Sequence, residues 1–151
     1  MAAVTLRALN LGADAALEAL PLLQVVWPTV TADAWLSYLG FVTMRSASHG
    51  AGVVVLRDTA GYICGVMVFE VERDLEEGRV LTVPLFLAID LANSSAPVHC
   101  LLDAARAKAA HFMCNGLQIR LYDGQSGVAG HVRGQGFIDR AGYLWASTRK
   151  T

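Results

Sequence analysis

The sequence has little charge. Only 17% of its 151 residues are charged, against 54% that are apolar, and 12 basic residues against 13 acidic ones leave a formal net charge of −1. Because it has no basic excess, the chain lacks the electrostatic footprint of most nucleic-acid-binding proteins. The apolar content excludes a disordered chain and predicts one domain, residues 1–151, with a single core. It also favours burial of apolar surface between two copies, so we expect a homodimer.

Cysteine is scarce as well. The three cysteines, Cys64, Cys100 and Cys114, are an odd number and form no Cys-x-x-Cys pair. This excludes a disulfide scaffold and a zinc ribbon, and it favours the reducing cytoplasm. We expect the three side chains to be small buried hydrophobes. The histidines show no metal-ligand spacing, so we predict no metal site.

Long apolar runs and several common catalytic motifs are missing. The longest apolar segment, Val80 to Ile89, contains Thr82 and Pro84 and is too short to span a bilayer. We see no export signal and expect no association with membranes. The chain also has no Gly-x-Ser-x-Gly elbow, Walker loop or Rossmann fingerprint, which argues against the hydrolase and nucleotide-binding classes that use them.

The first third of the chain is predicted to form a strand and two helices. Val4 to Leu9 is typical of a short strand, and the apolar residues of Ala13 to Trp27 fall at helical spacing. Pro21 is expected to kink or divide that helix. A second helix is predicted after Thr31, which can accept an N-cap hydrogen bond, with Asp33 in the first turn.

The middle of the chain predicts three consecutive strands. Val53 to Leu56, Tyr62 to Val71 and Arg79 to Ile89 are apolar runs separated by short polar turns, a pattern that favours an antiparallel meander. Pro84 interrupts the third run. Proline cannot donate to a ladder, so either a bulge or an edge position is expected there.

The last third predicts a crossover unit. Pro97 to Met113 has the apolar stripe of an amphipathic helix, and Leu117 to Tyr122 follows as a strand parallel to the third one. The glycine-rich residues 124–136 are expected to form a loop or a short helix, and Phe137 to Ser147 a strand or hairpin. The fold class is therefore α/β (α+β): a mixed central sheet in which an antiparallel meander precedes a crossover helix and a parallel strand.

This order of elements resembles the GNAT superfamily of acyl-CoA-dependent N-acetyltransferases along nearly the whole chain. The family often carries Asn-x-x-Ala-x-x-x-Tyr-x-x-x-Gly-Phe near its C-terminus. Gly136 and Phe137 match the final pair, while Gln125, Val128 and Val132 stand at the Asn, Ala and Tyr places. In the family the tyrosine often protonates the departing thiolate, a role that valine cannot perform.

The resemblance also implies a pyrophosphate site at the start of the crossover helix. The family motif there is Arg/Gln-x-x-Gly-x-Gly/Ala, whose backbone N–H groups bind the pyrophosphate of CoA. Here alanine and valine stand at the two glycine positions, Pro97 removes one N–H, and two serines could donate from their hydroxyls. The implied binding residues for acetyl-CoA are Ser94, Ser95, Ala96 and Val98.

A second part of the implied site is made by backbone. In the family the fourth and fifth strands splay apart, and the thioester enters between them. The resemblance therefore implies that the backbone groups of Leu87, Ala88 and Ile89 pair with the pantetheine arm. That role does not depend on the side chains.

Proton transfer requires a base for the amine and an acid for the thiolate. Tyr122 could replace the missing tyrosine if it faces the opening, although packing in the core is an alternative role. Asp123 lies at the end of the fifth predicted strand and is the carboxylate we select as a catalytic residue. Asp90, Glu70 and Glu72 are further candidates for the base, and solvated surface positions are the alternative for all of them.

Two hypotheses follow. In the first, the chain transfers an acetyl group from acetyl-CoA to a small-molecule or peptide amine. In the second, it is a catalytically inactive binding or dimerisation module of the same fold. Ala96, Pro97, Val98 and Val132 motivate the second hypothesis, because they replace or remove groups that the family uses.

Overall fold

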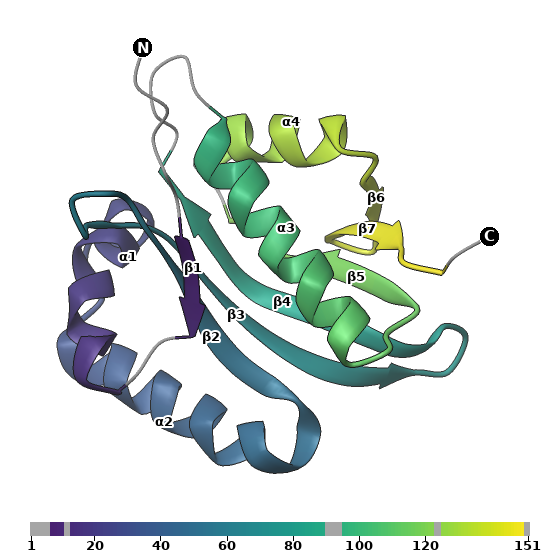
Figure 1. Ribbon diagram of the computed structural model, residues 1–151, viewed down its shortest axis with the longest axis horizontal. Helices are drawn as coiled ribbons and strands as arrows, with labels where there is room; N and C mark the ends of the chain where they lie inside the picture. The colour runs from purple at the N-terminus through teal and green to yellow at the C-terminus, as the bar shows by residue number, and fades with distance from the viewer. Residues whose placement is uncertain (1–6, 11–12, 90–94, 123–124, 150–151) are drawn as a thin grey trace.

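The structure is a computed structural model that describes residues 7–10, 13–89, 95–122 and 125–149 (Figure 1). In chain order the elements are β1 (Arg7–Asn10), the 3-10 helix η1 (Ala13–Ala19), α1 (Leu20–Val26), α2 (Ala32–His49), β2 (Ala51–Arg57), β3 (Ile63–Asp74), β4 (Gly78–Ala88), α3 (Ala96–His111), β5 (Gly116–Ile119), α4 (Ser126–Gly134), β6 (Ile138–Arg140) and β7 (Tyr143–Ser147).

The described strands form one mixed sheet in the order β1-β2-β3-β4-β5-β7-β6. All neighbouring pairs are antiparallel except β4 and β5, which are parallel. The predicted meander of β2, β3 and β4 and the crossover through α3 to a parallel strand are therefore confirmed. The connection through α3 places the helix against the sheet, as a parallel pair requires.

Helices cover both faces of the sheet. Figure 1 shows α3 running across β4 and β5, with α1 and α2 gathered on the other side. One buried cluster joins α3, α4 and one sheet face, around Phe86, Leu101 and Leu117. A second cluster joins η1, α1, α2 and the opposite face, around Leu23 and Trp35. These two layers account for the high apolar content of the chain.

The N-terminal helices begin where the sequence predicts. Thr31 caps α2, because its Oγ1 accepts a hydrogen bond from the Ala34 N–H at 3.1 Å. Pro21 lies in the first turn of α1, a position that needs no N–H donor. The predicted helix at Ala13 to Trp27 is accordingly divided into η1 and α1, as Pro21 indicated.

Pro84 lies in a bulge of β4. The two β4 residues Val83 and Pro84 lie opposite the single β3 residue Phe69, and the register of the two strands shifts by one residue there. This decides between the bulge and the edge position that the sequence left open. The bulge bends β4 away from β5 at the point where β5 ends.

The end of β5 differs from its prediction. β5 ends at Ile119 rather than at Tyr122, because β4 bends away after the Arg120 N–H has donated to the Val83 carbonyl at 3.0 Å. Residues 126–134 form the short helix α4, which is one of the two outcomes expected for the glycine-rich stretch. The C-terminal segment forms the hairpin of β6 and β7, which is one of its two expected outcomes.

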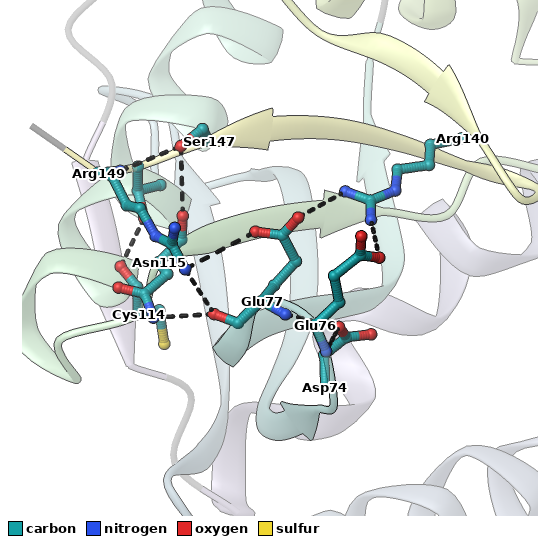
Figure 2. A network of polar contacts seen from close by, with 9 residues as sticks. Asp74, Glu76, Glu77, Cys114, Asn115, Arg140, Ser147 and Arg149 are labelled. Atoms are coloured by element: carbon teal, nitrogen blue, oxygen red, sulfur yellow. Dashed lines mark hydrogen bonds and ion pairs between the residues drawn. The ribbon is translucent and has the colours of Figure 1, made fainter. Parts of the chain in front are cut away.

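The opposite end of the β4–β5 pair is closed by a polar network (Figure 2). The Asn115 side-chain N–H donates to the Glu77 carbonyl at 2.9 Å, and the Arg149 guanidinium donates to the same oxygen at 3.2 Å. Arg140 pairs with Glu77 at 3.3 Å and with Glu76 at 3.5 Å. The network joins the β3–β4 turn to the start of β5 and the end of β7.

The cysteines are free thiols: Cys64 and Cys114 are buried and Cys100 is partly buried. Burial raises the pKa of each thiol, so all three remain protonated at neutral pH. Within the described ranges, no group of three His, Cys, Asp or Glu residues could hold a metal ion. None of the helices in the described part of the chain is long and apolar enough to cross a membrane.

Candidate functional site

The opening between β4 and β5 follows from the backbone direction of β4. The Ile89 N–H donates to the Cys64 carbonyl of β3 at 2.9 Å. Because backbone groups alternate along an antiparallel strand, Leu87 also faces β3, whereas Phe86 and Ala88 present their N–H and C=O groups to the opening. Of the three predicted backbone contacts, the structure therefore directs only Ala88 into the opening.

Two side chains bridge the opening. Gln125 lies immediately before α4 and is only 6% exposed. Its Nε2 donates to the Phe86 carbonyl at 2.9 Å, and its Oε1 accepts the Tyr122 N–H at 2.8 Å. The Tyr122 hydroxyl donates to the Pro84 carbonyl at 2.9 Å. We call Gln125 and Tyr122 the bridge, because they connect the separated strands through side chains alone.

A cavity of about 430 Å³ lies on the Gln125 side of the bridge. The end of β4, the start of α4 and the last turns of α1 form its walls. Its lining is predominantly apolar and comprises Leu22, Val25, Val26, Leu87, Ala88, Ile89, Gln125, Gly127 and Val128. We call it the β4 cavity, and its size and lining suit a largely apolar ligand.

The N-terminus of α3 carries the predicted anion-binding segment. Ser95 immediately precedes α3, and its hydroxyl makes no capping bond to the helix. Pro97 and Val98 are buried, and the Val98 side chain packs into the core around α3. The N–H groups of a first helical turn have no acceptor within the helix, so this segment can act on an anion through its backbone. Ser94 lies outside the described residues.

A second cavity of about 230 Å³ lies on the Tyr122 side of the bridge. One wall is formed by α1, α2 and the segment between them, and the other by β4 after the bulge and the segment after β5. The lining comprises Leu23, Trp27, Val30, Ala34, Trp35, Tyr38, Leu85 and Tyr122. The Trp27 and Tyr122 rings meet edge to face, with centroids 4.6 Å apart. We call this space the aromatic cavity.

A third cavity of about 150 Å³ adjoins the aromatic cavity at Tyr38 and is also lined by Glu70, Phe41 and Pro84. Burial raises the pKa of the Tyr38 phenol, and the nearby Tyr122 and Glu70 raise it further, while Arg120 opposes them. The phenol therefore stays protonated at neutral pH. Glu70 is the carboxylate that the described structure brings to the wall of these cavities.

Glu72, another of the predicted carboxylates, lies away from these cavities. Glu72 accepts a hydrogen bond from the Thr82 hydroxyl at 3.0 Å, and Thr82 accepts one from the Gln118 side chain at 2.8 Å. This chain of hydrogen bonds crosses the paired part of β3, β4 and β5, away from the opening. Asp123 and Asp90 lie outside the described residues.

Sequence reasoning gave no role to several residues of the site. Gln125 was matched only to the family's asparagine. A buried amide needs both a hydrogen-bond donor and an acceptor as partners, so a buried glutamine indicates that two polar groups lie beside it. Tyr38 falls at helical spacing after Thr31, and Trp27 stands directly before Pro28 at the end of the first predicted helix, so neither position by itself indicates a cavity wall. Val132 is fully buried in the core beneath α3, so no hydroxyl occupies the position of the family's tyrosine.

Comparison with known proteins gives matches in structure alone. No family model and no curated protein matches the sequence. The aminoglycoside N-acetyltransferase AAC(6')-Iy in complex with CoA superposes with a TM-score of 0.75 at 12% identity, covering 91% of each chain. An acetyltransferase of the GNAT family from Staphylococcus aureus Mu50 gives 0.74 at 11% identity, covering 96% of this chain and 100% of that one.

A third similar structure is the spermidine N-acetyltransferase from Vibrio cholerae in complex with CoA and spermine. It has a TM-score of 0.71 at 10% identity, and the match covers 95% of each chain. At such identities the likeness establishes the fold. The chain has the GNAT fold, as the order of its predicted elements indicated.

Proposed function

We propose that this chain is an acetyl-CoA-dependent N-acetyltransferase that acts on a small-molecule or peptide amine. The observation that carries the proposal is the opening between β4 and β5, with the β4 cavity on one side of the bridge and the aromatic cavity on the other. Two substrates entering from the two sides would meet at the bridge, because Gln125 lines one cavity and Tyr122 the other. Acetyl-CoA would supply the acetyl group as a thioester.

The β4 cavity fits the pantetheine arm of the co-substrate. Its wall offers the backbone N–H and C=O of Ala88, whereas the Phe86 carbonyl is already bonded to Gln125. Leu87 and Ile89 contribute apolar surface rather than backbone hydrogen bonds. We therefore assign backbone pairing with pantetheine to Ala88, and van der Waals contact to its two neighbours.

The start of α3 is proposed to hold the pyrophosphate. The Val98 side chain points into the core, so it does not block the approach of a phosphate to the backbone of the first turn. Ser94 and Ser95 would add hydroxyl donors, and Ala96 would bring a further backbone N–H. Pro97 supplies no donor, so we expect weaker binding than a glycine-rich turn would give.

Glu70 is the proposed base within the described residues. It lies beside Tyr38 and Pro84, so an amine in the aromatic cavity could transfer a proton to it directly or through one water. Asp123 follows Tyr122 in the chain and is the second carboxylate that we propose. Replacing each carboxylate by its amide separates the two candidates. The base is the residue whose replacement abolishes the rise of kcat/KM with pH.

Tyr122 is the proposed proton donor for the departing thiolate. Tyr122 lines the aromatic cavity, and its hydroxyl donates to the Pro84 carbonyl. In the balanced reaction the C–S bond of the thioester breaks and a C–N bond forms. The base removes the ammonium proton before attack, the nitrogen loses a second proton after attack, and the sulfur gains one to leave as a thiol.

Isothermal titration with acetyl-CoA tests the proposal, with desulfo-CoA as the control ligand. We expect micromolar binding and release of free thiol when an amine is added. Absence of binding at millimolar acetyl-CoA would contradict the enzyme proposal and favour the inactive binding module. Changing Ala96 and Val98 to glycine would then show whether the degenerate segment is the cause, because affinity should appear.

We also propose a cytoplasmic homodimer. The exposed apolar side chains Leu36, Phe41 and Met44 all lie on α2, where a second copy could cover them. The free thiols favour a reducing compartment. Light scattering across a dilution series tests the dimer: a constant monomer mass would contradict it, and Met44→Lys should shift a dimer toward the monomer.

A further inference from the structure

The aromatic cavity is small, and aromatic rings form much of its lining. The rings of Trp27, Tyr38 and Tyr122 face it, and Val30 and Leu85 complete the lining. Its volume of about 230 Å³ falls below the roughly 300–1,000 Å³ that is usual for drug-sized ligands. A molecule of about one ring would fill it, whereas an oligosaccharide would not fit inside.

Two of the polar groups in this cavity already have partners. The Trp35 indole N–H donates to the Ala16 carbonyl at 2.7 Å, and the Tyr122 hydroxyl donates to the Pro84 carbonyl at 2.9 Å. A ligand with many hydroxyl or amino groups would lose its hydration here without recovering equivalent bonds. The body of a matching ligand is therefore apolar.

The charges around the cavity favour a single positive charge. Glu70 lies next to Tyr38 in the adjoining cavity, where it can attract one ammonium group. No carboxylate lines the aromatic cavity itself, as far as the described residues extend. The Arg120 guanidinium lies 5.0 Å from the centre of the Tyr122 ring and would repel a second cation at this wall.

We propose that the acceptor is a small primary monoamine carried on an aromatic or similarly sized apolar body. This inference rests on the proposed N-acetyltransferase function. The apolar body occupies the aromatic cavity, and its amino group points past Tyr38 toward Glu70 and the bridge. The ring faces add a cation–π attraction for the ammonium form as it enters. Among the described residues that line the aromatic cavity and the adjoining one, Glu70 is the one carboxylate, so a polycation such as the spermine bound by one similar structure would find a single partner there.

The first experiment compares 2-phenylethylamine with spermidine and with an aminoglycoside, using thiol release from acetyl-CoA. We expect kcat/KM for 2-phenylethylamine to exceed that for spermidine by about 100-fold, because each extra ammonium would be desolvated without a partner. In the absence of acetyl-CoA, the monoamine should also quench the tryptophan fluorescence, and Trp27→Phe should reduce this quenching to the part that comes from Trp35, which lines the same cavity. A polycation that reacts or binds as well as the monoamine overturns the inference.

A pair of variants of equal side-chain size differs in the charge that it adds to the cavity. Ala34 lines the cavity in the first turn of α2, where an acidic residue suits the helix dipole. Ala34→Asp should narrow the preference for the monoamine over spermidine by about 10-fold, whereas Ala34→Asn should not, because only the former adds a charge. Leu36→Asp adds the same charge on the same helix outside the cavity lining, and should leave the preference unchanged.

The outcomes separate this inference from the proposed function. If the monoamine quenches Trp27 but acetyl-CoA does not bind, the proposed enzyme is wrong and the ligand class stands. If acetyl-CoA binds and polycations are the preferred acceptors, the function stands and the inference is overturned. If acetyl-CoA binds but no monoamine binds or reacts, the inference is overturned as well.

Discussion

The two ends of the β4–β5 pair are built in opposite ways. At one end, residues 80–83 pair with residues 116–119 in parallel register, and the side chains in Figure 2 fasten the strand ends to the β3–β4 turn. At the other end, the strands part after the bulge, and among the described residues the side chains of Gln125 and Tyr122 connect them. The closed end uses backbone pairing, while the open end uses side chains as spacers.

This difference shows how one sheet can be rigid and still contain a binding site. A β-ladder satisfies its own backbone groups and leaves none for a ligand. Beyond the bulge, Ala88 has N–H and C=O groups directed at a cavity, and the bridge keeps the strands from collapsing together. The comparison can be broken at either end, and each break should affect a different property.

Breaking the closed end should produce the largest loss of stability. Gly116 has no room for a side chain, because a Cβ there would lie 2.0 Å from the Trp145 ring. We expect Gly116→Ala to reduce the free energy of unfolding by about 3 kcal/mol through overpacking, as measured in urea. Acetyl-CoA affinity of the folded protein should be unchanged, since the opening is distant.

The matched control is Gly40→Ala, in the interior of α2, where a Cβ would meet nothing within 4 Å. That change should raise the free energy of unfolding by about 0.5–1 kcal/mol, because alanine is the better helix former. Equal effects of the two substitutions would contradict the close approach of Gly116 to Trp145.

Breaking the bridge should cost less stability but more binding. Gln125→Leu keeps the side-chain volume and leaves the buried Phe86 carbonyl without its donor. We expect a loss of about 2 kcal/mol in the free energy of unfolding. The Kd for acetyl-CoA should rise about 10-fold as the β4 cavity loses its polar wall. Gln135→Leu, in the exposed turn after α4, is the control, and a similar loss there would contradict the bridge.

The contrast between the ends also explains what the sequence could predict. The closed end follows from local rules. Apolar runs predict the strands, and a helix between two consecutive strands predicts that these strands are parallel. Pro84 predicted an irregularity in β4. The predicted length of β5 was wrong, because β5 ends where β4 bends away. That bend is a tertiary effect, which the apolar pattern of residues 117–122 does not reveal.

The open end was less predictable, because its parts come from distant segments. Gln125 lies in a glycine-rich stretch, and its two partners, Phe86 and Tyr122, are joined to it only in the folded chain. Tyr38 has helical spacing and Trp27 precedes the stop at Pro28, and their role as cavity walls depends on α1, α2 and β4 together. The alternation that directs Ala88 rather than Leu87 into the opening required the register with β3.

A milder break of the bridge separates chemistry from structure. Tyr122→Phe removes the hydrogen bond to Pro84 and should cost about 1 kcal/mol of stability. If Tyr122 protonates the thiolate, kcat should fall about 100-fold with little change in KM for acetyl-CoA. A purely structural role would lower stability and leave kcat of the folded enzyme unaltered. Tyr143→Phe, on β7 and outside the lining of the three cavities described above, is the control.

The smallest effect is expected at the exposed edge of the closed end, and it depends on pH. The Glu77 and Glu76 N–H groups donate to the Asp74 carboxylate and lower its pKa below the usual 3.8. A carboxyl whose pKa is lower in the folded state contributes stability above its unfolded pKa and loses it as pH falls through the folded value.

Asp74→Asn retains an acceptor oxygen but cannot titrate. It should therefore be nearly as stable as the parent at pH 7, and its urea midpoint should fall less between about pH 4 and pH 2. The same flattening in Asp103→Asn, which removes a charge on α3 away from this turn, would show that the effect reflects net charge rather than the Asp74 hydrogen bonds.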